Sequence, residues 1–193
     1  MKSFVVGVTM FVLAVIVALD GFAHTEKPDT AQKPAAAASA ASKPGAAKDW
    51  IDQWNDVTGR VIGVAEAMPP DKYDFKPVEE VGTFGDQVKH LCMAMRILLA
   101  NAEGKQIPLE SVNLDVLKTK DEILAELRRM TDEGAAVIKR VSGKNDGDVV
   151  ESQFFGKTTR RFLIIQAIAH DNNHYGQMVL YLRLNGITPP ASR

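Results

Sequence analysis

Apolar residues recur every three or four positions in four long segments of the chain, which is the spacing of a helix with one buried face. The pattern predicts helices over residues 49–68, 83–101, 120–141 and 159–185. Amphipathic helices of this length bury their apolar faces against one another. The sequence therefore predicts an all-α fold, a four-helix bundle.

Residues that begin or end helices flank these segments. Thr83 with Asp86 resembles a capping box at the start of the second helix, and Thr119 with Glu122 fits the same box at the third. Gly186, followed three residues later by two prolines, suits the end of the fourth helix.

The connections between the predicted helices are long. Residues 69–82 join the first helix to the second, and residues 142–158 join the third to the fourth. The second connection contains apolar residues that predict a short extended piece, namely Val149, Val150, Phe154 and Phe155. Such connections favour a bundle with crossover loops over a minimal up-and-down arrangement.

Residues 1–23 have the layout of a secretory signal peptide. Lys2 precedes an unbroken run of apolar and small residues from Phe4 to Leu19, and small residues then favour cleavage before His24. The run is about 16 residues long, shorter than the roughly 20 that cross a bilayer. We expect an exported, periplasmic or extracellular protein without a membrane span after cleavage. An uncleaved N-terminal anchor is the alternative.

Residues 24–48 are rich in alanine and contain the pair Lys-Pro three times. The prolines interrupt any helix and no apolar period is present, which indicates a disordered linker. Residues 49–193 then form one domain, of a normal size for a single core.

Composition and charge narrow the classes of function. The formal net charge is −1 at pH 7, which gives no electrostatic footprint for nucleic acid. Cys92 is the only cysteine, so an intrachain disulfide is impossible and packing must hold the fold. Cys92 lies two positions from His90, roughly on the opposite side of the helix, and we expect it to be buried rather than a metal ligand.

Polar residues interrupt the apolar fourth helix from His170 to Gln177. His170 and His174 are four residues apart and share one helix face, and His90 lies in the second helix. Three imidazoles without a fourth protein ligand form an open, catalytic-type metal site. Bundles commonly build such sites from facing helices. We therefore expect these three histidines to bind one divalent metal ion.

Three further polar residues are candidates for roles around the metal. Gln177 lies on the same face as the histidine pair and is a candidate to orient a ligand. Asp86, one turn before His90, is a candidate acceptor for that ring or a helix cap. Asp171 is a candidate base or hydrogen-bonding partner, or else a solvent-facing residue. A protease-like His-Glu-x-x-His role for it is not favoured, because no further ligand follows His174.

The stretch from Ala169 to Pro190, with His-x-x-x-His-x-Gly-Gln, Tyr-Leu-Arg and Pro-Pro, resembles the DinB/YfiT-like superfamily, as does the stretch from Phe84 to Leu91. The resemblance covers about residues 49–193. It implies a four-helix bundle in which the three histidines above hold a divalent metal, and a bundle that commonly dimerises. Members resemble thiol-dependent transferases and isomerases, or amidohydrolases.

Three hypotheses for function follow. The first is an enzyme that uses Zn²⁺, Ni²⁺ or a similar ion for hydrolysis or thiol transfer on an unknown small molecule. Export counts against thiol chemistry, because cytoplasmic thiol cofactors are scarce outside the membrane. The second is a non-catalytic metal-binding or stress-response module. The third is a structural bundle whose histidines only satisfy buried polarity.

Overall fold

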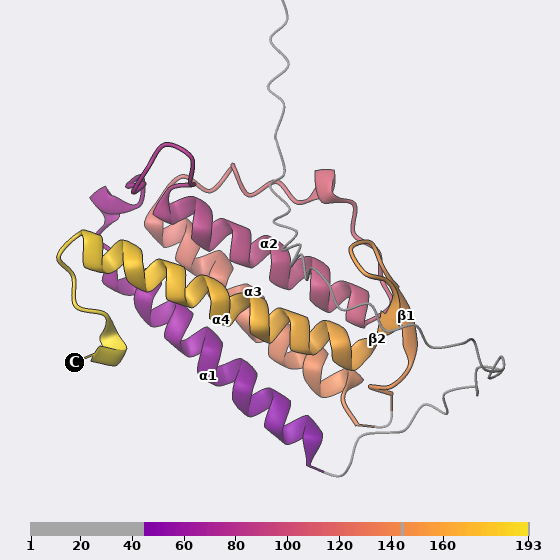
Figure 1. Ribbon diagram of the computed structural model, residues 1–193. Helices are drawn as coiled ribbons and strands as arrows, with labels where there is room; N and C mark the ends of the chain where they lie inside the picture. Colours follow the sequence, from indigo (N-terminus) through magenta and orange to yellow (C-terminus); the bar gives the residue numbers. More distant parts are fainter. Residues whose placement is uncertain (1–44, 144, 193) are drawn as a thin grey trace, which may run out of the picture. The chain divides into compact units, whose positions relative to one another are not determined.

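Four helices pack side by side in the computed structural model, which describes residues 45–143 and 145–192 (Figure 1). Their bounds are α1 (Ala46–Ala67), α2 (Phe84–Ala102), α3 (Lys120–Val141) and α4 (Arg160–Leu184). The all-α bundle is confirmed, and α1 begins three residues before its predicted start. The predicted signal peptide and nearly all of the predicted linker lie outside the described residues. Within the described part, no helix combines the length and apolar character needed to cross a membrane.

Side-chain caps fix where α2 and α3 begin. The Thr83 hydroxyl accepts a hydrogen bond from the Asp86 backbone N–H at 3.1 Å, and the Asp86 carboxylate accepts one from the Thr83 N–H at 3.0 Å. Thr119 and Glu122 form the same capping box at α3. Each box satisfies two backbone donors that a helix start leaves without partners.

The helices follow one another around the bundle in the order α1, α3, α2, α4. Helix α2 runs antiparallel to α4, since the Tyr181 hydroxyl donates to the carbonyl of Gly82 and Arg160 donates to that of Ala102. Helices α2 and α3 run parallel (Figure 1). Their connection, residues 103–119, must therefore return along the bundle, and it includes the 3₁₀ turn η2 (Leu109–Ser111).

This crossover lies in a different connection from those that the sequence singled out. Residues 69–82, which contain η1 (Pro70–Lys72), and residues 142–159 each join helix ends at the same end of the bundle (Figure 1). The α2–α3 connection must span about 28 Å, the length of a 19-residue helix at 1.5 Å per residue. The hydrophobic pattern gives helix lengths but not the neighbours of each helix, so it could not identify this connection.

A two-stranded antiparallel hairpin, β1 (Val149–Ser152) and β2 (Gly156–Thr159), precedes α4. Val149 and Val150 lie in β1 as the sequence predicts. Phe154 and Phe155 instead occupy the turn, where Phe155 packs edge-to-face on Phe162 with ring centroids 5.2 Å apart. The hairpin is registered so that Ser152 pairs with Gly156, which leaves no room for the phenylalanines in a strand.

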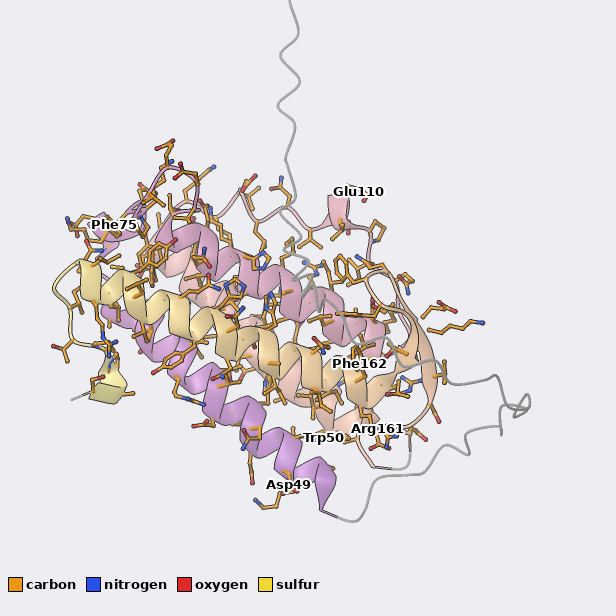
Figure 2. All side chains as sticks on the ribbon, viewed as in Figure 1. Asp49, Trp50, Phe75, Glu110, Arg161 and Phe162 are labelled. Atoms are coloured by element: carbon orange, nitrogen blue, oxygen red, sulfur yellow. The ribbon has the colours of Figure 1, made fainter. Side chains whose placement is uncertain are left out.

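Trp54 is the largest fully buried side chain and joins α1 to α3. Its indole N–H donates to the Thr131 carbonyl at 3.0 Å. Gly134 makes the close approach possible, because a Cβ there would lie 2.2 Å from the indole. Trp50, one turn earlier, is half-buried against the core (Figure 2). Both tryptophans therefore belong to the packing of α1, Trp54 within the core and Trp50 at its edge.

Candidate metal centre

The antiparallel packing of α2 on α4 brings the three helical histidines together. Ring centroids lie 5.1 Å apart for His90 and His170, 4.8 Å for His90 and His174, and 4.5 Å for His170 and His174. The Nε2 atoms of His90 and His170 are 3.1 Å apart. Each histidine offers one nitrogen, and these nitrogens all lie within 4.8 Å of one another.

This spacing fits one divalent cation. Nitrogens bound at about 2.0–2.1 Å in a tetrahedral site lie roughly 3.3 Å from one another. The 3.1 Å separation of His90 and His170 is close to that value, and the His174 nitrogen lies within 4.8 Å of the other two. Within the described residues, no other group of three histidine, cysteine or acidic side chains is placed to hold a metal.

The surroundings of His90 and His174 favour the neutral imidazole, which is the form that binds metals. Burial, together with the smaller effects of the neighbouring His170 and His90, lowers the pKa of His174 to about 3. Burial and the neighbouring His170 also lower the pKa of His90. Protons and a metal ion compete for the same nitrogens, so a site that disfavours protonation is prepared for the metal.

Gln87 is a functional candidate that the sequence reasoning missed. Its amide Oε1 lies 2.9 Å from Nδ1 of His174. An amide oxygen can only accept, so Nδ1 of His174 carries the proton and Nε2 keeps the lone pair that a metal requires. The available signal was position: Gln87 is one helical turn before His90 and shares its face.

Asp171 is buried rather than solvent-facing, with 1% of its surface exposed. Its Oδ1 lies 3.7 Å from Nδ1 of His170. Burial outweighs the opposing effect of His170, and the net result is a pKa for this carboxyl raised to about 6. The solvent-facing alternative is therefore wrong, because α4 is covered by neighbouring helices on the side that carries this residue.

The other two candidates are Asp86 and Gln177, and the structure shows a role for the first of them. The Asp86 carboxylate bonds the Thr83 backbone in the capping box, so the helix-cap alternative is the one that the structure shows. Gln177 is exposed on α4, one turn beyond His174. Its role as an orienting residue stays a prediction.

Cys92 provides a simple test of core packing beside the site. The side chain is 1% exposed, and burial raises the pKa of its thiol to about 12. We expect the native protein to react with a thiol reagent at pH 8 roughly 100-fold or more slowly than the unfolded chain. The reason is that the thiolate is the reactive form, whereas the native thiol is buried and stays protonated at this pH. Colorimetric titration with and without denaturant measures this, and rapid stoichiometric labelling of the native protein would contradict it.

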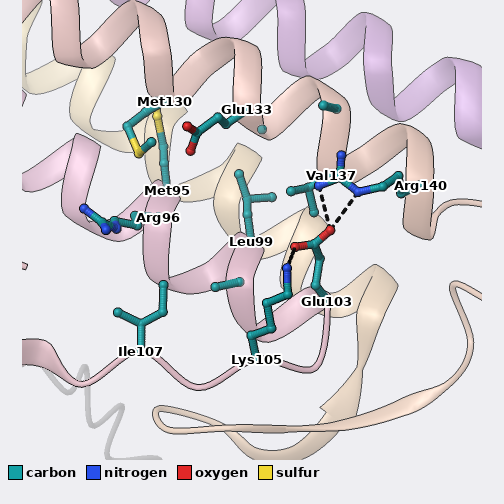
Figure 3. A pocket seen from close by; sticks show the side chains of 13 residues that line it. Met95, Arg96, Leu99, Glu103, Lys105, Ile107, Met130, Glu133, Val137 and Arg140 are labelled. Atoms are coloured by element: carbon teal, nitrogen blue, oxygen red, sulfur yellow. Dashed lines mark hydrogen bonds and ion pairs between the residues drawn. The ribbon is translucent and has the colours of Figure 1, made fainter. Parts of the chain in front are cut away.

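A separate cavity of about 380 Å³ lies between α2 and α3, away from the histidines (Figure 3). Met95, Leu99 and Val137 contribute its apolar lining. At its rim, Glu103 accepts hydrogen bonds from Lys105 and Arg140, which hold the pKa of its carboxyl below the ordinary value. Glu103 is thus paired with both cations, and the described lining of the cavity contains no group of side chains suited to a metal.

Fold and site together define a helical bundle with a three-histidine group positioned for a metal ion. The model of the DinB superfamily matches residues 53–178, and the chain belongs to this family.

Two solved structures have a similar fold. One is a DinB-like protein from Bacillus subtilis, 19% identical, with a TM-score of 0.62 over 72% of this chain and 94% of the other. The second is a DinB-like protein from Bacillus cereus, 16% identical, with a TM-score of 0.61 over 74% of this chain and 95% of the other. Among proteins with curated descriptions, none matches the chain. At these identities the likeness concerns the fold alone.

Proposed function

We propose that the protein is a metal-dependent enzyme that binds one divalent ion, Zn²⁺ or Ni²⁺, through His90, His170 and His174. The observation that carries the proposal is the convergence of three imidazole nitrogens within 4.8 Å of one another. No cysteine or carboxylate joins this group among the described residues. Three protein ligands leave a coordination position open for a small molecule, as in catalytic sites.

The chain's own residues prepare this site for chemistry. When bound, the ion would polarise a carbonyl group or lower the pKa of a water molecule. Gln87 keeps His174 in the tautomer that directs Nε2 to the site, and burial keeps His90 and His174 neutral. Of the three histidines, His90 has the largest exposed fraction although its ring packs against the other two, so we infer that solvent and substrate reach the site from its side.

Hydrolysis or thiol transfer on a small molecule is the reaction class that we assign to this site. Because residues 1–23 have the layout of a secretory signal, we place the activity in the periplasm or outside the cell. Hydrolysis is favoured of the two, since water is available there and cytoplasmic thiols are scarce.

Turnover by the metal-loaded full-length protein tests the proposal. We expect hydrolysis of a panel of amides and esters, or failing that thiol transfer, at least tenfold faster with one equivalent of Zn²⁺ or Ni²⁺ than after metal removal. His90→Ala is the matched variant that lacks one metal ligand, and it should lose the metal-dependent increase in rate. His90 lies outside the core, so its replacement should leave the fold intact. Equal rates with and without metal, or no turnover with any substrate class, would contradict the enzymatic proposal.

A further inference from the structure

Two neighbouring side chains on α4, Asp171 and His170, have buried polar atoms that make no hydrogen bond with the described residues. Both carboxylate oxygens of Asp171 are buried and make no hydrogen bond with the described residues, and the same is true of Nδ1 of His170. The two side chains are 3.7 Å apart at their closest nitrogen and oxygen. A modest rotation of either ring or carboxylate would bring them to hydrogen-bonding distance.

The burial of Asp171 is not explained by the fold. A carboxylate out of water is costly unless it is paired and hydrogen-bonded. Among the described residues, Asp171 has no lysine or arginine partner, and His170 is the only cation-forming group within salt-bridge distance. Only 1% of the surface of Asp171 is exposed, which places it in the interior of the bundle. An apolar side chain would suit this position better than an acid.

Metal-binding histidines supply a reason for such an acid. A histidine that binds a metal through one ring nitrogen usually donates its other N–H to a carboxylate or carbonyl, which fixes the tautomer and the ring orientation. Gln87 already does this for His174. In His170, Nε2 lies 3.1 Å from Nε2 of His90 and Nδ1 lies 3.7 Å from Oδ1 of Asp171.

We propose that Asp171 is a positioning residue whose buried carboxylate accepts a hydrogen bond from Nδ1–H of His170 and so presents Nε2 to the metal. The inference rests on the proposed metal site, and it assigns Asp171 no contact with substrate. Asp171 would then have two opposite effects: it strengthens metal binding, and it lowers the stability of the folded protein when no metal is bound.

Replacing Asp171 separates these two effects. In Asp171→Leu, which has a similar size and no charge, we expect the Kd for Zn²⁺ to rise 10- to 100-fold. We expect the denaturation midpoint of the metal-free variant to be equal to or higher than that of the wild type, because a buried acid is removed. Asp171→Asn keeps a neutral acceptor and should give an intermediate Kd. Asp132→Asn, at an exposed position on α3, is the control and should change neither quantity.

A second measurement keeps the inference testable if Asp171→Leu fails to fold. Nitrogen chemical shifts of the imidazoles in the metal-free wild type should show His170 protonated at Nδ1, and Asp171→Asn should reduce that preference. A wild-type His170 protonated at Nε2, or an Asp171→Leu variant with unchanged Zn²⁺ affinity, would overturn the inference. A wild type that binds no Zn²⁺ would instead overturn the proposed function.

Discussion

Replacing His174 with alanine is expected to abolish the stabilisation of the protein by added Zn²⁺ or Ni²⁺. An ion that binds only the folded state stabilises it by RT ln(1 + [L]/Kd), which is about 4 kcal/mol at a thousandfold excess over Kd. For a domain of this size, that raises the melting temperature by about 10 °C. His174 is the best candidate for this test, because its ring lies close to both other histidines and Gln87 fixes its tautomer.

Thermal melts of the full-length protein with and without metal measure this effect. His24→Ala is the matched control, since His24 is the only other histidine in the chain and should leave the shift intact. His90→Ala and His170→Ala should behave like His174→Ala. A melting shift that survives any one of these three replacements in full would show that the ion binds elsewhere.

Replacing Trp54 with alanine is expected to give the largest loss of stability, about 3–5 kcal/mol. The indole is fully buried, and its removal also leaves the Thr131 carbonyl without its indole donor. Trp50→Ala should cost less, because Trp50 is only half-buried. Chemical denaturation followed by circular dichroism measures both, and equal losses for the two variants would contradict this account of the core.

The close packing of Trp54 on α1 against Gly134 on α3 can also be tested by replacing the glycine. Gly134→Ala places a methyl group against the indole and should cost about 1–3 kcal/mol by overpacking. In a background of Trp54→Ala the same change should cost less, since the clash is gone, so the two effects should not add. Gly59→Ala, at an exposed helical position with open space, should instead stabilise by about 0.5–1 kcal/mol. Additive losses at Trp54 and Gly134 would contradict the proposed packing.

Much of the fold could be predicted because its signals are local. The apolar periodicity and the capping residues place each end of α2, α3 and α4 within a residue of the observed one. The order of the helices around the bundle depends on which apolar faces meet, and the sequence does not state this. For that reason the crossover at residues 103–119 was not identified, although both other connections were recognised as long.

The candidate site likewise contains residues that local sequence predicts and residues that depend on how the helices pack. The spacing of His170 and His174 on one helix face is local, and the pairing with His90 followed from the scarcity of histidine in the chain. Gln87 and Asp171 depend on the way α2 and α4 pack together. A glutamine one turn before a histidine has many other uses, so only the packed structure assigns Gln87 to the site. For Asp171 the sequence leaves a solvent-facing alternative open, and the packed structure excludes it.

X-ray absorption at the metal edge of the Zn²⁺-loaded full-length protein tests the central claim most directly. If His90, His170 and His174 bind one ion, the spectrum should show one zinc per chain with three imidazole nitrogens at about 2.0–2.1 Å and an exchangeable ligand such as water in the remaining position. A zinc ion surrounded by water or carboxylate oxygens, or by a single imidazole, would contradict the three-histidine site.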